Sequence, residues 1–359
     1  MKRLILCCDG TWNRADQAKA EDDGPARPTP TNVVKLAYRV AKHDGAIPQL
    51  VFYDQGVGTG NILDRVLGGA FGDGLDENIF DAYRFLMANY EAGDELFFFG
   101  FSRGAYTARS IGGMIRKCGI LKRSSFEQYA NAMQLYRSEA KPDGPEAVAF
   151  RREHSITGDE PIPIRFIGVW DTVGSLGIPL QGLRWLTFRK HAFHDTELSS
   201  LVKHACHALA IDELRGPFEP TLWTAKPKDG QLVEQVWFSG VHSDVGGGYN
   251  DDRLSDLTLA WMLERAGSAG LALDPTMAAQ RPVKGDSRGA LHPSKTGFYR
   301  LTRAYRRPIG LDARTGTRDP RQHVHPSVLA RWDRDPGYRP ENLRGWFRLV
   351  GDRQRAAQP

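Results

Sequence analysis

The sequence predicts an α/β fold, in which helices cover both faces of a mostly parallel central sheet. Short apolar segments with strand character alternate with segments of helical periodicity over the first 270 residues. Leu96–Phe99 is apolar throughout, which is typical of a strand buried on both faces of a parallel sheet. The 38 glycines among 359 residues exceed the usual ~7%, and this excess indicates tight turns between the elements.

In chain order, the short apolar run Leu4–Cys8 predicts the first buried strand, and Gln49–Asp54 predicts the second. Helices are expected over Val33–Lys42 and Glu77–Tyr90, because apolar residues recur there near helical spacing. Each of these helices follows a residue that favours the N-cap position, an asparagine and an aspartate. The first part of the chain therefore alternates strand and helix twice.

The apolar strand Leu96–Phe99 leads into a helix expected over Ala105–Lys117, and the polar residues 120–160 predict an insertion. Beyond residue 270 the periodicity fades into proline- and arginine-rich sequence, with one short helical candidate near Val328–Trp332. The remaining elements are expected as a strand over Ile164–Trp170, a helix over Leu198–Leu209, a strand over Val233–Phe238 and a helix over Leu254–Arg265. We therefore expect a catalytic unit over residues 1–270 and a basic extension over 271–359, packed on or beside it.

The cysteines and the N-terminus bear on the location of the protein. Four cysteines without a CxxC pair are too few for a disulfide framework, which favours a reducing compartment. The apolar run before Asp9 is shorter than the ~7–15 residues of a signal-peptide core, and no segment approaches the ~18 apolar residues of a membrane span. We expect a cytoplasmic protein, with export by a system that needs no signal peptide as the alternative.

Charge is distributed unevenly along the chain. Residues 281–359 hold 18 lysines and arginines against 7 acidic residues, whereas the rest of the chain is net negative. A solvated basic surface is the simplest interpretation, and an anionic membrane surface is the candidate partner for such a patch. Nucleic acid is not expected as a partner, because no binding motif accompanies the charge.

Ser102 is the candidate nucleophile. It lies in Gly100-Phe101-Ser102-Arg103-Gly104, which matches the G-x-S-x-G pattern of a nucleophile elbow. There a strand turns sharply into a helix, and the flanking glycines keep Cβ atoms out of the crowded turn. Residues 285–289 fit the same pattern around Ser287, but only Ser102 lies between a predicted strand and a predicted helix. We therefore expect Ser287 in a loop.

A serine nucleophile needs a base, and the base needs a carboxylate that orients it. Asp171 and His242 each follow one of the expected strands, and the order Ser, Asp, His along the chain fits a hydrolase of this architecture. His325 competes with His242 for the role of base. Asp195 and Asp212 compete with Asp171, although both lie beside or within predicted helices.

The loop Asp9-Gly10-Thr11 follows the first strand. A loop in that place can offer a backbone N–H group to an oxyanion, next to the N–H of Arg103. Asp9, Gly10, Thr11 and Arg103 are therefore the candidate oxyanion and substrate-binding residues. A simple Asp-Gly turn is the alternative interpretation.

Metal and cofactor sites are not predicted. His191 and His194, like His204 and His207, are three residues apart, which would place two imidazoles on one face of a helix. No cysteine pair or carboxylate at ligand spacing completes either set in the sequence, so a surface helix is the better explanation. The glycine-rich segments match neither the P-loop nor the dinucleotide pattern.

Four segments together resemble the bacterial and fungal α/β-hydrolase family whose best-known members are type VI secretion phospholipase effectors. In chain order over residues 1–270, they are Asp9–Thr11 after the first strand, Gly100–Arg109, Gly168–Gly174 and Gly240–Tyr249. The resemblance implies an α/β-hydrolase fold, a catalytic triad on Ser102, Asp171 and His242, and hydrolysis of a lipid ester.

From these observations we expect a serine esterase that cleaves a lipid or phospholipid acyl ester through an acyl-enzyme. A soluble carboxylesterase and a non-catalytic binding protein on the same scaffold are the alternatives. Residues 120–160 and 176–194 interrupt the alternation of strands and helices, and we expect them to form a cap over the site. The second segment mixes apolar residues with cations, which suits an acyl-chain entrance beside an anionic headgroup.

Overall fold

A mostly parallel sheet forms the centre of the computed structural model, which describes residues 1–10, 18–21, 24–56, 71–173, 198–312 and 315–351. In the strand order β10-β9-β8-β7-β6-β1-β5-β4, only the last pair is antiparallel. The strands are β1 (Arg3–Cys8), β4 (His43–Asp44), β5 (Ile47–Asp54), β6 (Glu95–Phe101), β7 (Ile164–Trp170), β8 (Val202–Ala210), β9 (Leu232–Phe238) and β10 (Gln322–Val324). A separate antiparallel pair contains β2 (Ala18–Glu21) and β3 (Gly24–Pro28). The predicted α/β class is confirmed.

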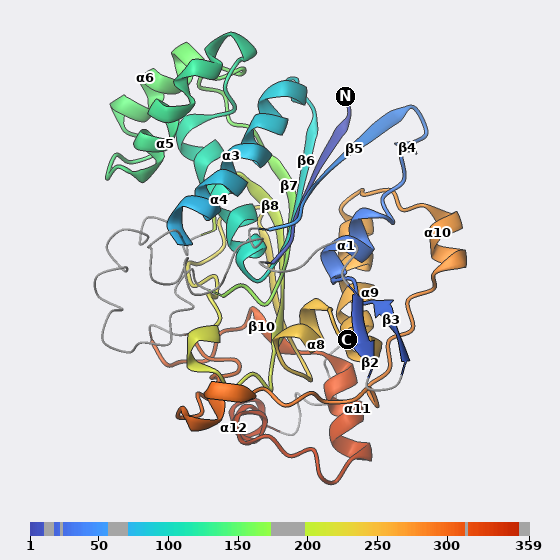
Figure 1. Ribbon diagram of the computed structural model, residues 1–359. Coiled ribbons are helices and arrows are strands. Elements are labelled where there is room, and N and C mark those ends of the chain that lie inside the picture. Colours follow the sequence, from blue (N-terminus) through green and yellow to red (C-terminus); the bar gives the residue numbers. More distant parts are fainter. Residues whose placement is uncertain (11–17, 22–23, 57–70, 174–197, 313–314, 352–359) are drawn as a thin grey trace.

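Helices cover both faces of the sheet (Figure 1). One face carries α3 (Phe71–Asn89), α4 (Arg103–Cys118), α5 (Tyr129–Arg137) and α6 (Pro145–His154). The other face carries α1 (Asn32–Ala37), α8 (His242–Gly246) and α9 (Arg253–Ser268). Short 3-10 turns are η1 (Arg123–Gln128) and η2 (Gly216–Phe218). Within the described part of the chain, no helix is both long enough and apolar enough to cross a membrane.

The central strand β6 separates the two cores. Phe97, Phe98 and Phe99 are all fully buried. Phe98 packs with α3 and α4, whereas Phe97 and Phe99 pack with α1 and α9, because successive side chains of a strand point to opposite faces of the sheet. The apolar run predicted to be a doubly buried strand is therefore confirmed.

The part of the chain beyond residue 270 extends the same sheet. β10 pairs in parallel with β9, and a third core joins Leu209 and Trp237 of the sheet to Leu343 and Trp346. The elements of this part are α10 (Pro275–Gln280), η3 (Gly297–Leu301), β10, α11 (Pro326–Arg334) and α12 (Glu341–Val350). The basic extension thus shares a core with the sheet, and α11 contains the short helix expected near Val328–Trp332.

The helix expected over Leu198–Leu209 is wrong. Val202–Ala210 forms strand β8, which lies between β7 and β9 and is paired with both. Alanines favour helices when no other interaction intervenes, but this segment fills a buried position in the sheet, where tertiary packing overrides the propensity. His204 and His207, three residues apart on a strand, therefore point to opposite faces.

Residues 120–160 do not lie where a cap over Ser102 requires them. Lys117 Nζ donates to the carbonyl oxygen of Ser138 at 2.7 Å, and Arg151 Nη1 donates to that of Lys117 at 3.1 Å. The segment thus packs on the C-terminal end of α4, whereas Ser102 precedes the N-terminal end. The physical reason is connectivity, because the segment links the end of α4 to the start of β7. The second expected cap segment, 176–194, lies outside the described residues.

Trp346 tests whether the C-terminal helices fold with the sheet. Its side chain is 1% exposed, so Trp346→Ala should lower the free energy of unfolding by about 3–5 kcal/mol by leaving a cavity in the shared core. Urea unfolding followed by circular dichroism measures this change, and Leu301→Ala, at a position 87% exposed, is the control. If Trp346→Ala instead unfolds in two phases, a main one at the wild-type urea midpoint and a smaller one at lower urea concentration, the C-terminal part folds on its own.

Candidate active site

The candidate catalytic residues each follow the carboxyl end of a parallel strand of the sheet. Ser102 follows β6, Asp171 follows β7 and His242 begins α8 after β9. The backbone N–H of Ser102 donates to the carbonyl oxygen of Trp170 at 3.0 Å, and that of Asp171 donates to Ala208 at 2.8 Å. These bonds join the residue that follows one strand to the neighbouring strand at the carboxyl end of the sheet, which is where α/β folds place their binding sites.

Ser102 has the backbone conformation of a sharp strand-to-helix turn. Its φ and ψ are 57° and −120°, and a positive φ in a residue with a side chain is strained. Glycine is required on either side of this turn because a side chain would clash with nearby backbone atoms. A Cβ on Gly100 would lie 2.4 Å from the carbonyl oxygen of Gly104, and one on Gly104 would lie 2.1 Å from that of Cys8. The close contact with Cys8 also brings the start of α4 against the end of β1.

The Asp171 carboxylate is fully buried and bonded on several sides. Its Oδ2 lies 2.6 Å from Nδ1 of His242, and its Oδ1 accepts the backbone N–H of Ala210 at 3.0 Å. Arg307 Nη1 donates to Oδ1 at 2.6 Å, and Nη2 donates to Oδ2 at 3.0 Å. Burial by itself would raise the pKa of Asp171, but the charge of Arg307 and the bond from His242 outweigh it and hold this pKa well below its ordinary value.

The His242 ring is held between two aromatic side chains. Its centroid lies 4.6 Å from that of Phe101 and 5.0 Å from that of Phe218. Phe101 directly precedes Ser102 in the chain, so the His242 ring packs on the last residue of β6. Gly246 leaves the room for Phe101, since a Cβ there would lie 2.0 Å from its ring. With Nδ1 facing Asp171, Nε2 is on the opposite side of the ring.

The competing residues have other contacts. The ring of His325 stacks on Phe238 with centroids 4.5 Å apart, and its Nδ1 lies 2.8 Å from Oγ of Ser327. Burial lowers the pKa of His325 to about 4. Asp212 accepts the N–H of Gly240 at 2.7 Å, while Asp195 lies outside the described residues. Ser287 lies in irregular chain, as predicted.

The buried Asp9 carboxylate accepts hydrogen bonds from its own loop and from two neighbouring segments. Its carboxylate accepts the N–H of Gly10 at 2.7 Å, the hydroxyl of Thr31 at 2.6 Å and that of Tyr53 at 2.9 Å, and the residue is 1% exposed. The backbone of Gly10 is thereby fixed near the start of α4, whereas Thr11 lies outside the described residues. Arg103 is the first residue of α4, and burial lowers the pKa of its side chain to about 10.

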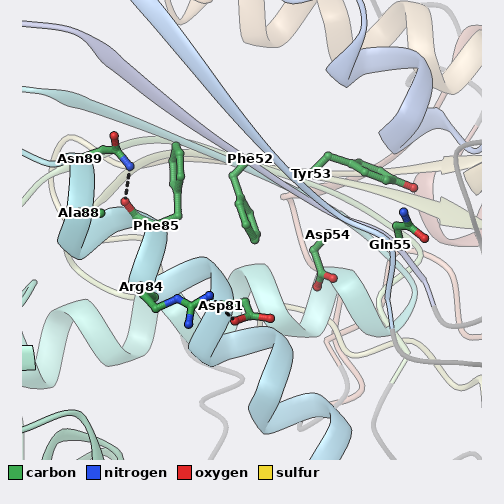
Figure 2. A pocket seen from close by; sticks show the side chains of 9 residues that line it. All are labelled: Phe52, Tyr53, Asp54, Gln55, Asp81, Arg84, Phe85, Ala88 and Asn89. Carbon is green, nitrogen blue, oxygen red and sulfur yellow. Dashed lines mark hydrogen bonds and ion pairs between the residues drawn. The ribbon is translucent and has the colours of Figure 1, made fainter. Parts of the chain in front are cut away.

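Two pockets lie away from these residues. One, of about 520 Å³, lies between β5 and α3, and Phe52, Asp54 and Phe85 are among its lining side chains (Figure 2). The rings of Phe52 and Phe85 stack 5.3 Å apart there. Burial raises the pKa of Asp54 to about 6. The other pocket, of about 540 Å³, adjoins His204 near the start of β8. Neither pocket is lined by a candidate catalytic residue.

His204, Cys206 and Glu234 bring three possible metal ligand atoms within 4.8 Å of one another. However, Glu234 Oε1 lies 2.9 Å from His204 Nε2, and Arg265 Nε donates to Glu234 Oε2 at 3.0 Å. Both carboxylate oxygens are thus engaged, and the guanidinium adds a positive charge beside them. The cluster is better explained as an ion-pair network than as a metal centre.

Sequence reasoning missed the buried charges behind His242. Arg307 comes from the arginine-rich part of the chain, where no local pattern distinguishes it from its neighbours. Glu213 is fully buried and accepts the N–H of His242 at 3.3 Å. The bonds of Arg215 and Ser294 to the Glu213 side chain hold the pKa of that carboxyl below its ordinary value, against the opposing effect of burial. None of these residues carries a motif.

Comparison with known proteins identifies the family. Residues 2–265 match the family described as the Tle1-like phospholipase effectors of the type VI secretion system, catalytic domain. The chain belongs to this family. The resemblance inferred from the four motifs is therefore confirmed, and the match ends shortly before the basic extension begins.

Individual relatives of this Tle1-like chain are longer than the chain itself. It is 31% identical over 260 residues to an uncharacterized protein of Saccharomyces cerevisiae, which covers 67% of this chain and 35% of the yeast protein. A solved uncharacterized protein from Pseudomonas aeruginosa is 20% identical with a TM-score of 0.42, covering 77% of this chain and 47% of that one. The Tle1 effector bound to the VgrG spike is 23% identical with a TM-score of 0.38, covering 69% and 51%.

His207 supports the Asp171 loop and predicts a pH dependence of stability. It is fully buried, and its Nε2 accepts the N–H of Thr172 at 3.0 Å. Burial, with a contribution from the charge of Arg109, lowers the pKa of His207 to about 3. Because the unfolded chain binds the proton near pH 6.5, stability falls as the pH drops from there toward 3.

His207→Gln keeps an acceptor for the N–H of Thr172 and removes the titrating ring. Between pH 7 and pH 5 the variant should therefore lose about 2 kcal/mol less unfolding free energy than the wild type. Urea unfolding at both pH values measures the difference. His43→Gln, at an exposed position, is the control. Equal losses in wild type and His207→Gln would contradict the assignment.

Proposed function

We propose that this chain is a serine esterase that cleaves an acyl ester of a lipid through an acyl-enzyme. The observation that carries the proposal is the 2.6 Å contact between His242 Nδ1 and the buried Asp171 carboxylate, at the edge of the sheet where Ser102 has a strained turn. A carboxylate, an imidazole and a serine at a strand-to-helix turn are the parts that ester hydrolysis by a triad requires.

In this mechanism Ser102 Oγ attacks the ester carbonyl while His242 Nε2 takes its proton. Asp171 holds the Nδ1–H tautomer and stabilises the imidazolium that forms. The backbone N–H of Arg103 and the loop Gly10–Thr11 bind the oxyanion. When the tetrahedral intermediate collapses, the proton passes to the leaving alcohol. Water, deprotonated by His242, then attacks the acyl-enzyme, releases the fatty acid and restores Ser102.

The lipid substrate is supported by family membership, because the matching family is one of phospholipase effectors. The same membership supports export by a type VI secretion system, which requires no signal peptide. The chain spans about a third to a half of the length of these relatives. Soluble carboxyl esters are the alternative substrates.

An anionic membrane surface is the proposed partner of the basic extension. Part of its charge is already used inside the protein, since Arg307 and Arg321 form ion pairs with Asp171 and Asp319. The exposed arginines of α12, Arg344 and Arg348, are the better contacts for lipid headgroups, each worth roughly 1 kcal/mol near such a surface.

The nucleophile is tested with a fluorophosphonate probe, which reacts with activated serines. The wild type should be labelled, Ser102→Ala should not, and Ser287→Ala should be labelled as fast as the wild type. Asp171→Asn should react about 10³–10⁴ times more slowly, because it disturbs the tautomer of His242. Unlabelled wild-type protein would instead favour a non-catalytic binding protein on this scaffold.

The substrate class is tested with mixed phospholipid vesicles. Free fatty acid should accumulate with wild-type protein and remain at background with Ser102→Ala. Adding anionic lipid should raise the rate, and Arg344→Gln with Arg348→Gln should reduce that gain without changing turnover of a short soluble ester. Activity on soluble esters alone would remove the lipid assignment and leave the esterase.

A further inference from the structure

Residues outside the family match contact the side chains around His242. The match ends at residue 265, yet three later residues bond to carboxylates around His242. His292 Nδ1 lies 2.6 Å from Asp244 Oδ1, and Ser294 Oγ donates to Glu213 Oε1 at 2.6 Å. Arg307 makes the third contact, to Asp171. The candidate site is therefore built from the matched region and from the extension together.

We propose that Arg307 is the positioning residue of this site: its guanidinium fixes both oxygens of the Asp171 carboxylate, so that Oδ2 stays directed at Nδ1 of His242. The inference rests on the proposed function, because it assigns Arg307 a part in the same triad. Arg307 acts through Asp171.

Arg307 contacts the Asp171 carboxylate through two of its guanidinium nitrogens. Nη1 and Nη2 each donate to a different oxygen of Asp171, at 2.6 and 3.0 Å. The same two nitrogens donate to the carbonyl oxygens of Ala210 at 2.8 Å and Phe218 at 2.5 Å. These carbonyls lie on β8 and η2, so the guanidinium plane is held by the sheet on one side and by a turn on the other. The carboxylate plane is held with it.

The residue type matters because both partners are fully buried. A carboxylate with no water around it stays ionised only if other groups compensate its charge. A planar guanidinium can satisfy two carboxylate oxygens at once, whereas a lysine ammonium is a single point charge and cannot set the plane. Arg307→Lys therefore separates the contribution of charge from that of geometry.

The charge of Arg307 also affects the pH at which the site works. The titratable and charged groups around Asp171 are His242, whose Nδ1 lies 2.6 Å from Oδ2, Arg307, His207 behind the Asp171 loop and Glu213 beside the His242 backbone. Without the guanidinium, the negative charge of Asp171 acts on His242 uncompensated, and we therefore expect a displaced pH profile of the reaction.

The experiment measures the rate of fluorophosphonate labelling of the full chain as a function of pH. Arg307→Gln should lower the plateau rate at least tenfold and move the acid limb at least half a pH unit upward. Arg307→Lys should keep the acid limb in place and lower the plateau about threefold or more. Arg151→Gln is the control, because Arg151 is a buried arginine that forms an ion pair with the partly exposed Asp159 at the far end of α4. It should lose stability in urea and keep the wild-type profile.

An unchanged plateau and acid limb in both Arg307 variants, or the same changes in Arg151→Gln, would overturn the assignment. If Arg307→Gln does not fold, the plateau of Arg307→Lys decides, and a wild-type value counts against the inference. A second readout is independent of catalysis, namely the low-field proton resonance of the His242–Asp171 hydrogen bond. It should persist in the wild type and Arg307→Lys and be lost or shifted in Arg307→Gln. Unlabelled wild-type protein would refute the proposed function, and this resonance would still decide the role of Arg307.

Discussion

The buried charge of Asp171 is the constraint on which the rest of the candidate site depends. A carboxylate without access to water must be compensated by hydrogen bonds and by opposite charge. The required groups come from three parts of the chain, since Ala210 belongs to β8, His242 to α8 and Arg307 to the C-terminal extension. In its buried position, the carboxylate stays ionised only because these elements are assembled around it. Its chemistry and the tertiary structure are therefore coupled.

The serine depends on a different kind of constraint, which is steric. The conformation of Ser102 is strained, and it persists because its neighbours leave no alternative. Gly100 and Gly104 approach other backbone atoms so closely that no side chain fits at either position. The contact between Gly104 and the end of β1 also brings Gly10 near the start of α4. A local turn and a long-range packing contact thus prepare the place where an oxyanion is proposed to bind.

The extension beyond the family match belongs to the same folded unit as the sheet. It adds β10 to the edge of the sheet, and Trp346 packs with Trp237 of β9 in a shared core. The arginines of the extension have different environments. Arg307 is fully buried against Asp171, while Arg344 and Arg348 are exposed on α12. A net charge computed over this region therefore says little about its surface, because internal ion pairs consume part of it.

The sequence alone determined the features that depend on nearby residues. The apolar run of β6, the glycines around Ser102 and the strand-end positions of Asp171 and His242 could all be predicted, because each follows from a pattern within a few residues. Tertiary structure decided the rest. Val202–Ala210 has the alanines of a helix but forms β8, because its place between two strands outweighs propensity. Residues 120–160 pack on the end of α4 that is remote from Ser102, and Arg307 alone among the arginines of its region reaches Asp171 in the described structure. Such contacts join residues far apart in the chain, and no local pattern encodes them.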